Sequence, residues 1–190
     1  MTQRHEFAVI AVNRRDGKVL WQKTAIRKLP HEGGHYTGSL ASNSCVTDGE
    51  LIFAFFGSHG LHCFDKHGTL KWQKEFGEMQ TKHGHGESSS PALFGDTLVI
   101  NWDHDAKSFV VAFDKRTGRQ LWRKDRDEET SWSSPIIVEQ DDKPLLIVAG
   151  TNRVRGYDLA TGEIVWQCGG LSSNIVATQQ LVFGDEVLLV

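Results

Sequence analysis

Histidine and carboxylate side chains gather in two short segments near the middle of the chain. One segment carries His83, His85 and Glu87, and the other is Asp103-His104-Asp105. Imidazole nitrogens and carboxylate oxygens are common ligands of divalent metal ions. The sequence therefore predicts that His83, His85 and His104 bind one metal ion, with Asp103 or Asp105 completing the shell or orienting an imidazole. The competing interpretation is a pair of solvated polar loops, because a His-x-His pair alone is a weak metal signal.

A repeated phrase indicates which elements position these segments. Each copy has an Asp or Asn, a tight turn ending in Gly, and a Trp four residues after the Gly. The copies contain Trp21, Trp72, Trp122 and Trp166, which lie 51, 50 and 44 residues apart, with Asp65, Asp114 and Asp158 and with Gly118 and Gly162. This period predicts one supersecondary unit per copy. We expect the Asp to accept hydrogen bonds from turn amides and the Trp to pack between neighbouring sheets.

Each repeat resolves into four short strand candidates separated by turn residues, and no segment has a clear amphipathic helical period. Four-stranded antiparallel units at this spacing are typical of β-propeller blades. The predicted fold is therefore all-β, a single propeller domain with about four blades' worth of strands. The predicted units are a half blade at 7–28, whole blades at 36–80, 88–126 and 131–168, and a half blade at 172–190.

The two half blades leave two arrangements open. They could join in a closed four-bladed ring, or the chain could be part of a larger ring of seven or eight blades. Ending in mid-strand favours the larger ring. An open ring leaves blade edges uncovered, which predicts self-association through those edges.

Composition excludes some partners. The net charge of −3 and the pI near 6.3 argue against nucleic-acid binding, which needs a basic face. No apolar run approaches the length of a membrane-spanning helix, and no signal peptide is visible at the start. The mixed charges at 124–129 are typical of a solvated surface.

The third repeat, 112–122, matches the phrase Ala-x-Asp-x-x-Thr-Gly-x-x-x-Trp at every defined position, and the fourth departs only by Gly156 in place of Ala. The chain thus resembles the pyrroloquinoline quinone (PQQ)-like β-propeller family with its tryptophan-docking motifs. That family includes PQQ- and calcium-dependent alcohol and sugar dehydrogenases. It also includes a non-enzymatic lipoprotein scaffold of outer-membrane barrel assembly. The resemblance implies a bacterial, extracytoplasmic protein, either periplasmic or secreted.

In a propeller, the links between blades and the loops between second and third strands share one face. This places six of the nine histidines on one rim, namely His31, His35, His59, His83, His85 and His104. Glu87 joins them, and Trp132 begins an innermost strand, where it could floor a ligand pocket or pack between blades. We expect this rim to bind a protein partner or a small ligand.

The resemblance leaves two functions open. The first is a non-catalytic binding or protein-interaction scaffold with no catalytic residues and no cofactor. The second is part of a quinoprotein alcohol or sugar dehydrogenase that uses PQQ and calcium. Many such enzymes carry an adjacent cysteine pair, whereas the closest cysteines here are Cys45 and Cys63. No dehydrogenase role is therefore assigned to any residue.

Overall fold

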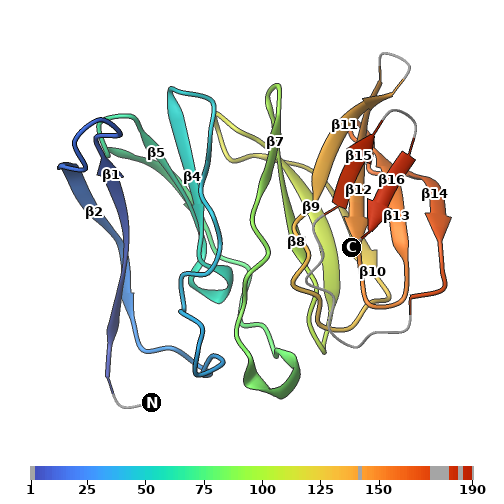
Figure 1. Ribbon diagram of the computed structural model, residues 1–190, viewed down its shortest axis with the longest axis horizontal. Coiled ribbons are helices and arrows are strands. Elements are labelled where there is room, and N and C mark those ends of the chain that lie inside the picture. The colour runs from blue at the N-terminus through green and yellow to red at the C-terminus, as the bar shows by residue number, and fades with distance from the viewer. Residues whose placement is uncertain (1–2, 141–142, 172–179, 184–185, 190) are drawn as a thin grey trace.

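The computed structural model describes residues 3–140, 143–171, 180–183 and 186–189. They form antiparallel β-sheets that follow one another along the chain, three of them four-stranded and two of them two-stranded (Figure 1). This confirms the predicted all-β fold of four-stranded propeller blades. Within the described residues, no helix is long and apolar enough to cross a membrane.

The strands occur in sequence order within each sheet. The first sheet contains β1 (His5–Val12) and β2 (Val19–Lys28). The second contains β3 (Val46–Thr47), β4 (Leu51–Phe55), β5 (Leu61–Asp65) and β6 (Leu70–Lys74). The third contains β7 (Ala92–Phe94), β8 (Thr97–Trp102), β9 (Ser108–Asp114) and β10 (Gln120–Arg126). The fourth contains β11 (Ile136–Gln140), β12 (Lys143–Ala149), β13 (Val154–Asp158) and β14 (Ile164–Cys168).

The last sheet pairs β15 (Gln180–Phe183) with β16 (Glu186–Leu189). Two 3-10 turns, η1 (Gly57–His59) and η2 (Lys82–Gly84), lie in the connections. Because β1–β2 and β15–β16 are separate sheets, the described strands do not form the shared blade that a closed four-bladed ring requires.

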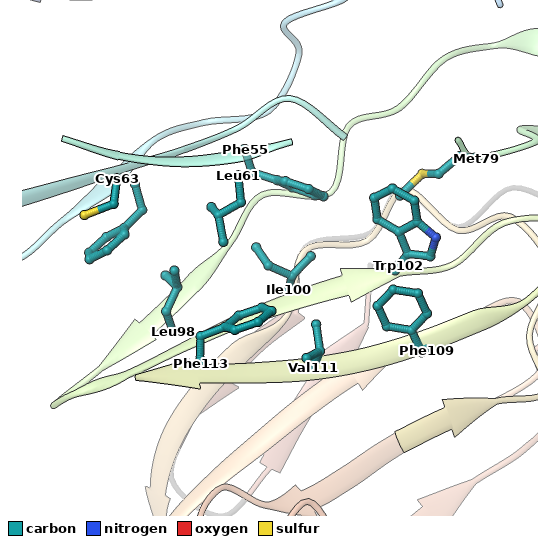
Figure 2. Packing of buried hydrophobic residues seen from close by; sticks show 11 residues of the cluster. Phe55, Leu61, Cys63, Met79, Leu98, Ile100, Trp102, Phe109, Val111 and Phe113 are labelled. Carbon is teal, nitrogen blue, oxygen red and sulfur yellow. The ribbon is translucent and has the colours of Figure 1, made fainter. Parts of the chain in front are cut away.

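Hydrophobic side chains fill the space between consecutive sheets. Alternate residues of β8 point to opposite faces, so Leu98 and Ile100 pack against the second sheet while Val99 packs toward the fourth. Figure 2 shows the first of these interfaces, where Trp102 and Phe109 stack with ring centroids 5.6 Å apart. Each four-stranded sheet therefore depends on its neighbours for burial, as expected for repeat units.

The turns that carry the repeated Asp and Gly residues share one edge of the sheets, the upper edge in Figure 1, which we call the turn edge. In the third sheet, Asp114 Oδ1 accepts hydrogen bonds from the backbone N–H groups of Arg116 and Thr117 and from the Thr117 hydroxyl. Asp158 binds Thr161 in the same way. Asp65 accepts from two turn amides. These bonds hold the tight turns that the Gly residues close.

The tryptophans reach from one sheet to the turn of the next. Indole N–H groups donate from Trp21 to Lys66 O at 3.0 Å, from Trp72 to Lys115 O at 3.0 Å, and from Trp122 to Leu159 O at 2.8 Å. Their rings lie on the turn glycines of the next repeat, Gly68, Gly118 and Gly162. Trp166 is half-buried and lies against Gly156 of its own sheet. The hairpin that contains each of these four tryptophans also has a β-bulge or similar irregularity in its strand register.

Candidate functional site at the rim

The opposite edge of the sheets, which we call the rim, consists of the links 29–45, 75–91 and 127–135 and the loops 56–60, 103–107 and 150–153. It is the lower edge in Figure 1. The six histidines placed there from the sequence do lie in these segments. The loops are held together by backbone bonds, for example from Asp105 N to Gln80 O at 3.0 Å.

Aromatic rings cross the rim in a continuous row, which we call the aromatic row. Tyr36 lies 4.5 Å from His35, His35 lies 5.2 Å from His85, and His85 lies 6.2 Å from Trp132, measured between ring centroids. His83 flanks His85 at 5.4 Å. The Trp132 indole donates to Gly86 O at 2.7 Å, which fixes that end of the row. The row thus joins three consecutive blade links.

The residues of the predicted metal set lie in adjoining segments, but several are already engaged. His104 Nδ1 accepts a hydrogen bond from Gln80 N at 3.1 Å, and its Nε2 lies 3.2 Å from Lys107 O. Burial lowers the pKa of His104, so the neutral ring is favoured. Asp105 accepts from the backbone N–H and the hydroxyl of Thr130. Metal binding by His83, His85 and His104 stays a prediction.

Asp103 forms a fully buried ion pair that sequence reasoning missed. Its carboxylate binds the Arg126 guanidinium through two hydrogen bonds of 2.8 and 3.1 Å, and both side chains are 0% exposed. Arg126 also donates to Tyr157 at 2.7 Å, and Asn101 donates to Asp103 at 3.1 Å. Asp103 therefore joins β8, β10 and β13 rather than facing solvent.

A second buried pair corrects the interpretation of 124–129 as a solvated surface. Arg155 donates to Glu128 at 2.6 Å and also to Asp127, and the side chains of Arg155 and Glu128 are 4% and 0% exposed. Arg126 and Glu128 continue the period of two that begins with Trp122, so they point inward. That alternation was the available signal, and the high charge of the segment concealed it.

A different cluster holds three possible ligand side chains. His31, Glu32 and Glu87 each offer one ligand atom, and these atoms lie within 4.8 Å of one another. Glu87 accepts from the backbone N–H and the hydroxyl of Ser58, both at 2.5 Å. Burial raises the pKa of Glu87. Glu32 accepts from the Thr81 hydroxyl.

His59 lies beside this cluster and is only 5% exposed. Its ring packs edge-on against Phe7 at 4.2 Å and stands 6.1 Å from the His31 ring. Its Nδ1 is buried and has no hydrogen-bond partner among the described residues. Burial lowers its pKa.

The serine-rich segments that begin the inner strands form a polar ladder between blades. Asn43 Nδ2 donates to Ser89 O, and the Ser89 hydroxyl donates to Ser133 O. In the next rung, Ser44 N donates to the Ser90 hydroxyl, and Ser90 N donates to the Ser134 hydroxyl. Small hydroxyl side chains therefore serve packing and hydrogen bonding here.

The ladder borders a small polar cavity of about 10 Å³. Its lining includes Glu87, Asn101, Asp103 and Trp132. The side-chain oxygens of Asn43 and Asn101, both in this lining, are buried and have no partner among the described residues. A cavity of this volume has room for about one water molecule, which would bind to such oxygens.

Comparison with known proteins identifies the family. The sequence profile of the outer membrane protein assembly factor BamB matches residues 5–180. The chain belongs to this family. No curated protein sequence is significantly similar to it.

Solved structures share the fold. BamB from Moraxella catarrhalis superposes with a TM-score of 0.65 at 15% identity, covering 91% of this chain and 50% of that protein. The quinohemoprotein alcohol dehydrogenase from Comamonas testosteroni has a TM-score of 0.59 at 13% identity, covering 96% and 36%. The corresponding enzyme ADHIIG from Pseudomonas putida HK5 has a TM-score of 0.59 at 16% identity, covering 96% and 35%. The chain spans half or less of each of these proteins.

Proposed function

We propose that this protein is a non-catalytic propeller module that binds a protein partner at its rim. The aromatic row carries this proposal. Tyr36 is 91% exposed at one end of the row, and the half-buried Trp132 is anchored at the other. Tyr and Trp are enriched among residues that dominate binding energy at protein interfaces, because they bury large area at low entropic cost.

The family supports the same proposal. BamB is by name an assembly factor of outer membrane proteins, and 91% of this chain follows its fold. We therefore infer an extracytoplasmic role in which the rim contacts an outer-membrane protein or another assembly component. The rim groups suited to acid–base chemistry are largely engaged within the fold, since Asp103 binds Arg126, Asp105 binds Thr130, and His104 binds backbone groups.

The structural likeness to quinohemoprotein alcohol dehydrogenases favours a second candidate, a quinoprotein with PQQ and calcium. Glu87, Asn101 and Asp103 supply oxygen atoms of the kind that calcium takes, and they line one cavity. That cavity of about 10 Å³ does not admit a tricyclic quinone, and Arg126 holds both carboxylate oxygens of Asp103. These two observations support the non-catalytic module over a quinoprotein.

Self-association is a further part of the proposal. β1 pairs with β2 alone among the described strands, and this hairpin exposes Ile10 (51%), Val12 (52%), Val19 (61%) and Leu20 (63%). Exposed strand edges with apolar residues favour association. We expect the chain expressed alone to form oligomers, as measured by light scattering, and a monodisperse monomer would contradict this.

Site-specific crosslinking tests the rim. A photoreactive phenylalanine analogue replaces Tyr36 on the rim or, as the matched control, Val19 on the turn edge. We expect Tyr36 to give a defined crosslink to an outer-membrane or assembly protein in the producing cells, and the crosslink to disappear when Trp132→Ala is added. Equal capture from both positions would contradict a specific rim.

An activity assay separates the two candidates. The protein is incubated with PQQ and Ca²⁺, and dye-linked oxidation of alcohols and sugars is followed. We expect no turnover above the cofactor-only control. Turnover that depends on the protein would refute the non-catalytic proposal.

A further inference from the structure

We propose that His31, Glu32 and Glu87 bind one divalent transition-metal ion, for which Zn²⁺ is the suitable probe. His31 and Glu32 come from the link between β2 and β3, and Glu87 comes from the link between β6 and β7. The ion would therefore join two consecutive blade links on the rim. This inference goes beyond partner binding and involves different residues from the metal set predicted from the sequence.

The distances suit metal binding after a small adjustment. The three ligand atoms lie within 4.8 Å of one another, and His31 Nε2 is 3.9 Å from Glu87 Oε1. Ligands at about 2.1 Å from a tetrahedral Zn²⁺ stand about 3.4 Å apart. The side chains therefore need to close by roughly 1 Å.

The surrounding hydrogen bonds already orient both carboxylates. Ser58 donates to both oxygens of Glu87, and Thr81 donates to Glu32. His31 Nε2 lies 2.8 Å from the Met79 carbonyl oxygen and must exchange that contact for the ion. Metal-binding carboxylates in proteins are held in this way by neighbouring donors. A carboxylate oxygen that accepts one hydrogen bond keeps another lone pair for a metal.

The charge of the cluster also favours a cation. Two carboxylates stand close together, and the side chain of Glu87 is only 13% exposed. Among the described residues, the only basic side chain within 4 Å of the Glu87 carboxylate is His31, and no basic side chain lies that close to Glu32. A divalent ion would compensate for both carboxylates.

His59 provides an independent indication. It is 5% exposed, its Nδ1 has no partner among the described residues, and its ring stands edge-on to His31 at 6.1 Å. A buried imidazole nitrogen without a partner is costly. A metal ion with its bound water beside His31 would supply that nitrogen with a hydrogen bond.

Calorimetry with Zn²⁺ tests the site. The whole chain is used in a Cys45→Ser/Cys168→Ser background, because both thiols are exposed and thiolates bind zinc. We expect one Zn²⁺ per chain. His31→Asn and Glu32→Gln should each weaken binding at least tenfold, and His59→Phe should weaken it less. The matched control is His83→Asn/His85→Asn, which removes two other rim histidines and should leave the affinity unchanged.

Each outcome decides the proposal. Absence of zinc binding overturns it, as does binding that is lost in the His83/His85 variant and kept in His31→Asn. Glu87→Gln is a further ligand variant, to be used if circular dichroism shows that it folds. The visible spectrum of bound Co²⁺ gives a second readout, since it should change in His31→Asn and not in the control. Crosslinking at Tyr36 tests partner binding separately, so the two proposals fail independently.

Discussion

The turn edge and the rim are built on opposite principles. On the turn edge, Trp21, Trp72 and Trp122 make the same indole hydrogen bond to the following repeat. On the rim, the serine ladder repeats from link to link, but the buried ion pairs Asp103–Arg126 and Glu128–Arg155 occur once each. The repeated edge holds blades in order, whereas the unrepeated edge differs from blade to blade. Function that needs a unique surface therefore belongs on the rim.

The largest expected effect is on the rim. Asp103→Ala leaves the buried Arg126 guanidinium without its carboxylate, which should lower the free energy of unfolding by about 3–5 kcal/mol. Asp125→Ala is the control, because the Asp125 side chain is 91% exposed and should cost less than about 0.5 kcal/mol. Urea unfolding followed by fluorescence measures both. Equal values for the two variants would mean that the ion pair is not buried in solution.

On the turn edge, we expect an almost equally large loss of stability when Trp122 is replaced. Trp122 is 8% exposed, so Trp122→Ala should lower the free energy of unfolding by about 3 kcal/mol or more through the cavity it leaves. A loss under about 1 kcal/mol in urea unfolding would show that the ring does not pack between the sheets.

A comparison of two turn glycines separates the effect of the Trp122 contact from the effect of backbone strain. Gly17 and Gly162 have φ of +72° and +73°, so Ala at either position is strained by about 1–2 kcal/mol. A Cβ on Gly162 would meet the Trp122 ring at 2.7 Å, whereas a Cβ on Gly17 has no atom within 4 Å. Gly162→Ala should therefore cost about 1 kcal/mol more than Gly17→Ala in chemical denaturation. The same loss at both sites would contradict the close packing of Trp122 on this turn.

The smallest expected effect is a pH dependence from buried histidines. Burial lowers the pKa values of His59, His62 and His104 below 6.5. As pH falls through about 6.5, the unfolded chain takes up protons that the folded chain does not, so stability present above that pH is lost. His62→Gln should reduce the slope of unfolding free energy between pH 7 and 5.5. Glu87, whose pKa is raised, has the opposite effect on stability, but it contributes equally to the wild type and to the variant. Identical slopes for the two proteins would show that His62 does not contribute to the pH dependence.

The sequence predicted the features that the repeat period encodes. The Asp-to-Gly turns, the interblade position of Trp122 and the four-stranded sheets all follow from residues that recur. The Asp103–Arg126 pair was missed because it joins residues 23 apart within one blade and occurs once. The clustering of His31 with Glu87 was missed because it depends on how two irregular links fold. The His-x-His spacing at His83 and His85 instead predicted a metal site in an adjacent part of the same rim.

The indole bonds of the turn edge also bear on synthesis and folding. Each bond joins a tryptophan to a carbonyl 37 to 45 residues further along the chain. A blade that emerges from the ribosome therefore lacks the hydrogen bond of its tryptophan until the next repeat has been translated. At about 5–20 residues per second, this takes several seconds. During that interval, its outer strand is open to proteases and to wrong partners. Folding should consequently propagate from the N-terminus one repeat at a time, with each new turn fixing the blade before it.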